Sequence, residues 1–174
     1  GWGYELIKHD YTTYDILGRW GFQMGAELTS DNWHFADRSK TTAEIVLDLY
    51  RAIREAAGKA LLIGCNTVGH LGAGLFEMQR IGDDNGTDWD RTRRMGVNAL
   101  GFRIVQHEAF FAADADCAVL TPAMPWNMAR QWLHLLATSG TPLFVSAHPG
   151  EITAEQRRAI REAFEAASKP HLPA

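Results

Sequence analysis

The sequence lacks any apolar run of about 18 residues, the length that a membrane-spanning helix needs. Its start shows no charged segment followed by an apolar one, so no signal peptide is predicted. The net charge is −4, and no run of Lys or Arg is interleaved with aromatic residues. We therefore expect no membrane segment and no nucleic-acid partner. The compartment and the oligomeric state stay open.

Cysteine is also scarce. Cys65 and Cys117 lie far apart and form no CxxC or Cys/His spacing, so neither a zinc site nor a disulfide framework is predicted. Gly69, Gly72 and Gly74 fit no GxGxxG pattern, and the sequence has no GxxxxGK[ST] motif. These absences argue against a dinucleotide or nucleotide site. We expect no metal and no cofactor.

What is present is the composition of one globular domain. The 174 residues are 46% apolar and 22% charged, enough for a single core over residues 1–174. The chain opens on Gly1-Trp2-Gly3 directly before an apolar strand pattern. That abrupt start predicts a piece of a longer protein.

Apolar runs and helical patterns alternate along the chain. The helix beginning at Thr41 or Thr42 has a stripe of apolar residues at successive i+4 steps, and Thr153 with Gln156 forms a capping box for the last helix. The expected elements begin with a strand at 4–10, a long loop at 11–40, a helix up to residue 57 with the inward stripe Ile45, Leu49, Ile53 and Ala56, and strands at 59–66 and 80–84. They continue with a helix that Thr87 and Asp90 cap and that carries Trp89, Met95 and Val97, a strand at 98–105, a helix at 125–140, a strand at 141–146 and a final helix.

This alternation predicts an α/β fold, either a doubly wound sheet or a (β/α)8 barrel. Polar residues follow the expected strands at the end where barrel enzymes build their sites, which favours the barrel. At roughly 25 to 30 residues per unit, a whole barrel needs about 250 residues. The sequence therefore predicts a partial (β/α)8 barrel. The polar strand-end residues are Asp10, Cys65, Asn66, Asp84, Asp114, Asp116, Ser146 and His148.

Lys8 and Asp10 are the first pair of charges at such a strand end. Side chains two apart on a strand share a face, so Lys8 can hold Asp10 ionised, as a carboxylate nucleophile requires. A surface ion pair is the alternative. Several carboxylates around one pocket, together with abundant aromatic residues, suit glycoside hydrolysis.

The strand-end motifs resemble those of the retaining α-galactosidases, or melibiases, of glycoside hydrolase families 27 and 36. Lys8-His9-Asp10 resembles the Lys-x-Asp at the end of the fourth barrel strand, and Arg80 to Asp84 resembles the Arg-x-x-x-Asp of the sixth. Cys65 with Gly69 resembles the turn after the fifth strand. Segments 113–117 and 141–146 resemble motifs of the seventh and eighth strands.

The resemblance implies strands 4 to 8 of the barrel, the C-terminal half, acting on a small carbohydrate with a terminal α-galactoside. It implies Asp10 as the nucleophile that forms a covalent glycosyl-enzyme and Asp84 as the general acid/base. It further implies substrate contacts from Lys8, Cys65, Asn66, Arg80 and Asp116. The first three strands, which carry the aspartates for the galactose 4- and 6-hydroxyls, have no counterpart in this sequence.

Several alternatives stay open. Asp83 rivals Asp84, because a one-residue slip in a short strand exchanges the side chain that faces the pocket. Asp116 either contacts substrate or binds backbone amides of its loop, and Cys65 and Asn66 either line the pocket or pack at a strand end. The chain could also be a non-catalytic carbohydrate-binding half barrel, a galactosyl transferase or an α-N-acetylgalactosaminidase. Further side chains with two interpretations, structural or substrate-directed, are Trp20, Trp33, Trp126, His34, His70 and His107.

Overall fold

The structure is a computed structural model that describes residues 3–18, 34–86, 88–148 and 150–169. The chain divides into two compact units, Gly1–Arg80 and Ile81–Ala174. Each unit is described by itself. A single domain over residues 1–174 stays a prediction.

Unit 1 is built on three parallel strands. Strand β1 (Leu6–His9) pairs with β2 (Leu61–Gly64), and β2 pairs with β3 (Met78–Arg80). In the register, His9 lies opposite Gly64, and Gly64 lies opposite Gln79. The carboxyl ends of the three strands therefore meet at one edge. The strands predicted at 4–10 and 59–66 are confirmed, and both are shorter than expected.

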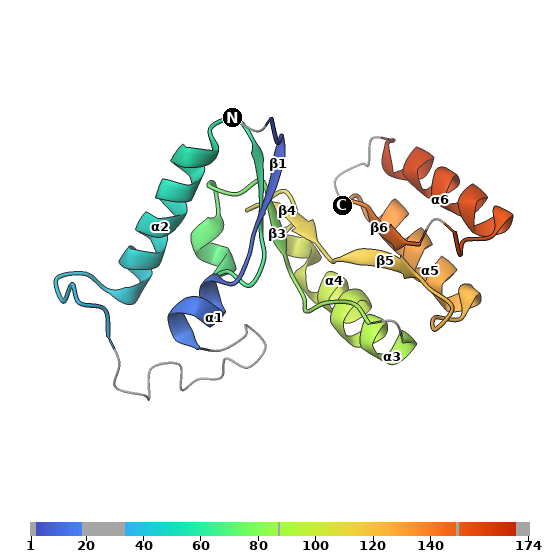
Figure 1. The fold of residues 1–174 in the computed structure, drawn as a ribbon, viewed down its shortest axis with the longest axis horizontal. Helices are drawn as coiled ribbons and strands as arrows, with labels where there is room; N and C mark the ends of the chain where they lie inside the picture. The colour runs from blue at the N-terminus through green and yellow to red at the C-terminus, as the bar shows by residue number, and fades with distance from the viewer. Residues whose placement is uncertain (1–2, 19–33, 87, 149, 170–174) are drawn as a thin grey trace. The chain divides into compact units, whose positions relative to one another are not determined.

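Helix α2 (Thr42–Ala57) lies alongside these strands (Figure 1) and begins with a complete capping box between Thr41 and Glu44. The predicted inward stripe is wrong by about one residue, because Val46 and Tyr50 are buried while Leu49 is exposed. Adjacent helical residues differ by only about 100° around the axis, so a stripe read from spacing alone can shift by one position. The core of this unit is formed by Val46, Tyr50, Leu62 and Phe76.

The first part of the predicted long loop is helical. Helix α1 (Thr12–Leu17) ends at Gly18, which adopts the left-handed conformation (φ 65°) that favours glycine after a helix. Six residues are too few to show a helical period in sequence, which explains the error. A short 3₁₀ helix, η2 (Gly69–Gly72), follows β2 in the glycine-rich segment.

The apolar pattern of the first strand does not make it a buried strand in unit 1. Leu6 and Ile7 are 43% and 37% exposed, and Lys8 is exposed. Within the described part of unit 1, β2 is the one strand that pairs with β1, so β1 is an edge strand of this unit.

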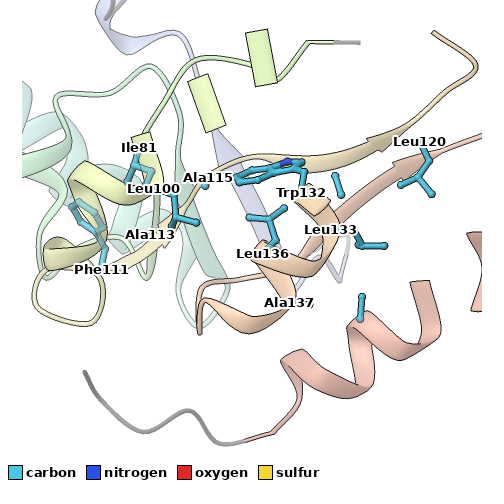
Figure 2. Packing of buried hydrophobic residues seen from close by; sticks show 12 residues of the cluster. Ile81, Leu100, Phe111, Ala113, Ala115, Leu120, Trp132, Leu133, Leu136 and Ala137 are labelled. Atoms are coloured by element: carbon cyan, nitrogen blue, oxygen red, sulfur yellow. The ribbon is translucent and has the colours of Figure 1, made fainter. Parts of the chain in front are cut away.

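Unit 2 contains the parallel strands β5 (Cys117–Leu120) and β6 (Phe144–Ala147), and β4 (Ala112–Asp114) precedes them. Helices α5 (Trp126–Thr138) and α6 (Ala154–Ala167) pack against each other, and α6 begins with the predicted capping box of Thr153 and Gln156. Figure 2 shows Trp132, Leu133 and Leu136 projecting from α5 into the core of this unit. The helix predicted at 125–140 and the last strand are confirmed.

The strand predicted at 98–105 is wrong. Residues 89–106 are helical throughout, as α3 (Trp89–Thr92), a π-helical turn η3 (Arg93–Val97), α4 (Asn98–Arg103) and a 3₁₀ turn η4 (Ile104–Gln106). Helix elongation is cheap once a first turn exists, so the segment continues the helix despite its apolar, strand-like composition. Only Leu100 of α4 is buried, whereas Phe102 is 84% exposed.

The short strand predicted at 80–84 lies earlier in the chain. Strand β3 ends at Arg80, and residues 81–86 form an irregular turn that carries Asp83 and Asp84. Within the described residues no helix is both long and apolar enough to cross a membrane.

Candidate functional site

Asp10 comes directly after β1 in unit 1, and two hydrogen bonds hold its carboxylate. Oδ1 accepts from the backbone N–H of Tyr11 at 2.7 Å and from Nδ2 of Asn66 at 2.9 Å. Tyr11 has a left-handed backbone (φ 73°), which turns its N–H back onto the carboxylate. The chain thus bends sharply at the strand end, and the Asp10 side chain stays at that edge.

These contacts lower the pKa of Asp10. Burial is the largest single influence and raises the pKa, but it is outweighed by hydrogen bonds from Asn66, the Tyr11 N–H and the Cys65 thiol, and by the Lys8 charge. The sequence predicted that Lys8 would keep Asp10 ionised, but the Lys8 charge is the smallest of these influences on the pKa. Asp10 is therefore ionised at neutral pH, chiefly because of hydrogen bonds.

Cys65 and Asn66 follow β2. The Cys65 N–H donates to the His9 carbonyl at 2.8 Å, which extends the β1–β2 pairing to the site. Asn66 has a left-handed backbone (φ 46°), and its carbonyl accepts from the Thr13 N–H at 2.8 Å. Both side chains are thereby directed to Asp10.

The Cys65 side chain is buried, and burial raises the pKa of its thiol to about 11. The charges of Arg80 and Lys8 oppose this shift without cancelling it. Cys65 is therefore a neutral thiol at physiological pH and not a thiolate nucleophile. Arg80, the last residue of β3, acts electrostatically on this edge of unit 1. Five of the predicted site residues thus influence one another: Lys8, Asp10, Cys65, Asn66 and Arg80.

Asp83 and Asp84 lie in the irregular turn of unit 2 and have different surroundings. Asp83 forms an ion pair with Nη2 of Arg91 at 2.7 Å, and its other oxygen accepts from the Asp84 N–H at 2.8 Å. Nε of Arg91 donates to the Asp84 carbonyl at 2.9 Å. Arg91 therefore holds the turn through both residues, while the Asp84 residue is exposed to solvent.

Asp116 is buried and belongs to the same unit. Its Oδ2 accepts from the Asn85 N–H at 2.6 Å, and its own N–H donates to Oδ1 of Asp114 at 2.8 Å. Nδ2 of Asn85 donates hydrogen bonds of 3.1 Å to the carbonyls of Ala115 and Cys117. One carboxylate oxygen of Asp116 thus binds a backbone amide, as in the loop interpretation.

Sequence reasoning missed Arg91 and Asn85. Arg91 lies near the start of the helical segment, where the helix dipole disfavours a cation. An arginine at such a position could have suggested that an acidic residue outside the helix binds it. Asn85 follows Asp84 directly, but its partners lie about thirty residues further on. No spacing rule connects them.

The side chains with two interpretations divide as follows. His107 is structural, since Nε2 donates to the Gly140 carbonyl at 3.0 Å and Nδ1 accepts from the Ala113 N–H at 3.1 Å. Trp126 packs against the unit 2 core. His34 contacts the carbonyl of its neighbour Phe35. Trp20 and Trp33 lie outside the described residues.

Comparison with known proteins shows the fold. The sequence matches no protein-family model, and no curated protein sequence matches it. Two solved structures of an α-galactosidase from Thermus thermophilus are similar. The one in complex with stachyose has a TM-score of 0.61 and 19% identity, covering 93% of this chain and 34% of that one. The complex with p-nitrophenyl α-D-galactopyranoside has a TM-score of 0.51 and 20% identity, covering 67% and 27%.

The chain therefore has an α/β fold of parallel strands and flanking helices, a partial barrel of the (β/α)8 type, like that of an α-galactosidase. It spans about a third of the length of that enzyme.

Proposed function

We propose that this chain is the C-terminal half, strands 4 to 8, of the catalytic barrel of a retaining glycoside hydrolase that acts on terminal α-galactosides. The observation that carries the proposal is Asp10, an ionised carboxylate at the carboxyl end of a parallel strand in a chain with an α-galactosidase-like fold. Barrel enzymes build their active sites at these strand ends.

In this proposal Asp10 is the nucleophile. Its carboxylate attacks the anomeric carbon, the bond to the leaving oxygen breaks, and a covalent glycosyl-enzyme forms. The hydrogen bonds from Asn66 and Tyr11 lie on Oδ1, and they hold the carboxylate in one orientation. A low pKa keeps it ionised, as a nucleophile needs.

Asp84 is the proposed general acid/base. It protonates the leaving oxygen in the first step and takes a proton from the attacking water in the second. The Arg91 ion pair occupies the Asp83 carboxylate, which supports Asp84 as the residue that reaches the leaving oxygen. The Asp84 residue is also the more exposed of the two.

The remaining site residues have supporting roles in the proposal. Lys8 and Arg80 bind sugar hydroxyls as hydrogen-bond donors, and Cys65 and Asn66 present Asp10 as well as touching the sugar. Asp116 contacts the substrate, while its Oδ2 accepts from the Asn85 N–H. The rest of the sugar pocket belongs to a longer chain that contains these 174 residues.

The test is covalent labelling. We would incubate this chain, and separately a longer chain containing it, with an activated fluoro-galactoside and locate the adduct by peptide mass spectrometry, with hydrolysis of an aryl α-galactoside measured in parallel. We expect the adduct on Asp10 and its loss in Asp10→Asn. Sugar binding without an adduct or turnover in either chain would replace the proposal with the non-catalytic carbohydrate-binding scaffold.

A further inference from the structure

The turn that carries Asp84 is joined to the connection between β4 and β5 through Asn85. Nδ2 of Asn85 donates to the carbonyls of Ala115 and Cys117, both at 3.1 Å. The Asn85 N–H donates to Oδ2 of Asp116 at 2.6 Å. Asn85 thus binds three consecutive residues of that connection, and these three bonds, called here the Asn85 linkage, lie within unit 2.

The orientation of the Asn85 amide follows from its partners. Both partners of Nδ2 are carbonyl oxygens, which only accept hydrogen bonds, so the NH2 group must face them. The amide oxygen, Oδ1, is buried and has no hydrogen-bond partner among the described residues. An unpaired buried oxygen costs free energy, so Asn85 stabilises the fold less than its hydrogen bonds alone would. Its clearer effect is on where the two segments lie.

Glycines let the helical residues 89–106 approach the same turn closely. A Cβ on Gly82 would lie 2.2 Å from the Met95 carbonyl oxygen, and a Cβ on Gly96 would lie 2.7 Å from Oδ1 of Asn85. Met95 and Gly96 both belong to the π-helical turn η3, a feature that is frequent at functional sites. Asn85 therefore packs against η3 as well as binding the β4–β5 connection.

The part of the turn that precedes Asn85 is also held. The Ile81 N–H donates to the Asp114 carbonyl at 2.9 Å, where the turn begins. Nε of Arg91 donates to the Asp84 carbonyl at 2.9 Å. The backbone that carries Asp84 is therefore fixed on both sides, although the Asp84 residue is exposed to solvent.

We propose that Asn85 is a positioning residue for Asp84, which holds the Asp84 turn at a set distance from the Asp116 connection so that both carboxylates keep one arrangement toward the sugar. The catalytic part of this proposal rests on the proposed function, in which Asp84 is the general acid/base. The linkage itself does not. A general acid must lie within hydrogen-bond reach of the leaving oxygen, so a displacement of about 1 Å slows proton transfer.

Hydrogen exchange tests the linkage in this chain. In the unaltered protein the Asn85 NH2 group should exchange with solvent about tenfold or more slowly than that of Asn127, an exposed residue of α5. Asn85→Ala removes both bonds from Nδ2, so the backbone N–H of residue 85 and that of Asp116 should exchange roughly fivefold faster. Asn85→Asp has the size of asparagine but no NH2 group, so exchange there should be at least as fast as in Asn85→Ala.

Kinetics of a longer chain that contains these residues test the positioning role. The ratio kcat/KM reports the steps up to cleavage of the glycosidic bond, and an activated aryl leaving group needs little help from a general acid. Asn85→Ala should therefore lower kcat/KM about tenfold for an unactivated galactoside, and less than about twofold for an activated aryl galactoside. Asn85→Asp should not restore the loss, because size alone does not rebuild the bonds.

Ser139→Ala is the matched control. The Ser139 hydroxyl hydrogen-bonds the Leu136 carbonyl at 2.9 Å and the Thr141 hydroxyl at 2.7 Å, in the same unit. Its loss should lower the unfolding free energy, change both kcat/KM values by the same factor and leave exchange at residue 85 unaltered. A leaving-group pattern like that of Asn85→Ala would overturn the positioning role, because the pattern would then follow from lower stability.

The outcomes separate this proposal from the proposed function. An Asn85 NH2 group that exchanges as fast as that of Asn127 overturns the linkage, whatever the longer chain does. Equal losses for both galactosides in Asn85→Ala, or full activity in Asn85→Asp, overturn the positioning role. If exchange confirms the linkage but the longer chain neither labels Asp10 nor hydrolyses either galactoside, the hydrolase proposal fails, the positioning role fails with it, and the linkage stands.

Discussion

Asn66 donates from Nδ2 to Oδ1 of Asp10 across 2.9 Å, although 56 residues separate the two in sequence. The Asn66 backbone adopts φ 46°, and its carbonyl is held by the Thr13 N–H. The bond joins the ends of β1 and β2 and, after burial, is the largest of the influences on the pKa of Asp10.

Asn66→Gly tests that bond without backbone strain, because glycine tolerates the left-handed conformation. We expect the pKa of Asp10 to rise in a ¹³C NMR titration of the carboxylates, and labelling by the fluoro-galactoside to slow about tenfold. Asn66→Asp should raise the pKa further, because it places a second carboxylate beside the first. An unchanged pKa in both variants would contradict the assignment.

Acid stability should depend on Asp10. Its pKa in the folded protein lies below the ordinary value of an aspartate, so the ionised carboxylate stabilises the fold above that ordinary value and the contribution is lost as the pH falls through the folded pKa. Asp10→Asn should therefore lose stability near pH 7 and show a flatter decline between about pH 5 and pH 2. Urea unfolding at several pH values measures how the unfolding free energy of each protein depends on pH. If the Asp10→Asn variant lost the same amount of stability at every pH, Asp10 would not be the titrating group.

Glu77 joins the start of β2 to α2. Its Oε2 accepts from the Leu62 N–H at 2.7 Å, and both oxygens pair with Nη1 of Arg54 at 2.9 and 3.0 Å. Glu77→Ala leaves that N–H and Nη1 of Arg54 without their acceptor, while Nη2 keeps the carbonyls of Gly58 and Ala60. We therefore expect about 1 to 2 kcal/mol lower unfolding free energy, allowing for the partial exposure of the pair. Asp48→Ala removes an exposed ion pair with Lys40 and should lower the unfolding free energy less than Glu77→Ala does, because solvent screens exposed charges.

Gly64 is required by packing. A Cβ there would lie 2.3 Å from Oε1 of Gln79 and 2.7 Å from the Phe76 ring. Gly64→Ala should lower the unfolding free energy by about 1 to 3 kcal/mol. Gly101 in α4 has nothing within 4 Å of its Cβ position, so Gly101→Ala should raise it by about 0.5 to 1 kcal/mol. Thermal unfolding of the two variants should therefore shift in opposite directions.

Asp83 and Asp84 can be separated by leaving-group dependence. In a chain that turns over, Asp84→Asn should slow hydrolysis of an unactivated galactoside by about 10² or more, and should slow bond cleavage far less for an activated aryl galactoside. Asp83→Asn removes the charge that pairs with Arg91, so it should reduce both rates by similar factors and lower the stability of the turn. Equal leaving-group effects in the two variants would argue against Asp84 as the acid.

Local sequence signals predicted the helices well. The Thr41 and Thr153 capping boxes fixed the starts of α2 and α6, since a cap is made by residues within one turn of each other. The helix carrying Trp89, Met95 and Val97 was also predicted, but its continuation over residues 98–105 was expected to be a strand. That segment is apolar enough for a strand, and it is helical because it continues the preceding turns.

The sequence by itself determined the strands β1, β2 and β6 and the helices α2, α5 and α6. It also placed Lys8, Asp10, Cys65, Asn66 and Arg80 at strand ends, because these features depend on periodicity and on neighbours within a few residues. Tertiary structure alone decided which groups act on one another. Asp10 is ionised through Asn66 more than through Lys8, and Asp83 is bound by Arg91. Such contacts depend on distances between strands and loops, which sequence spacing does not encode.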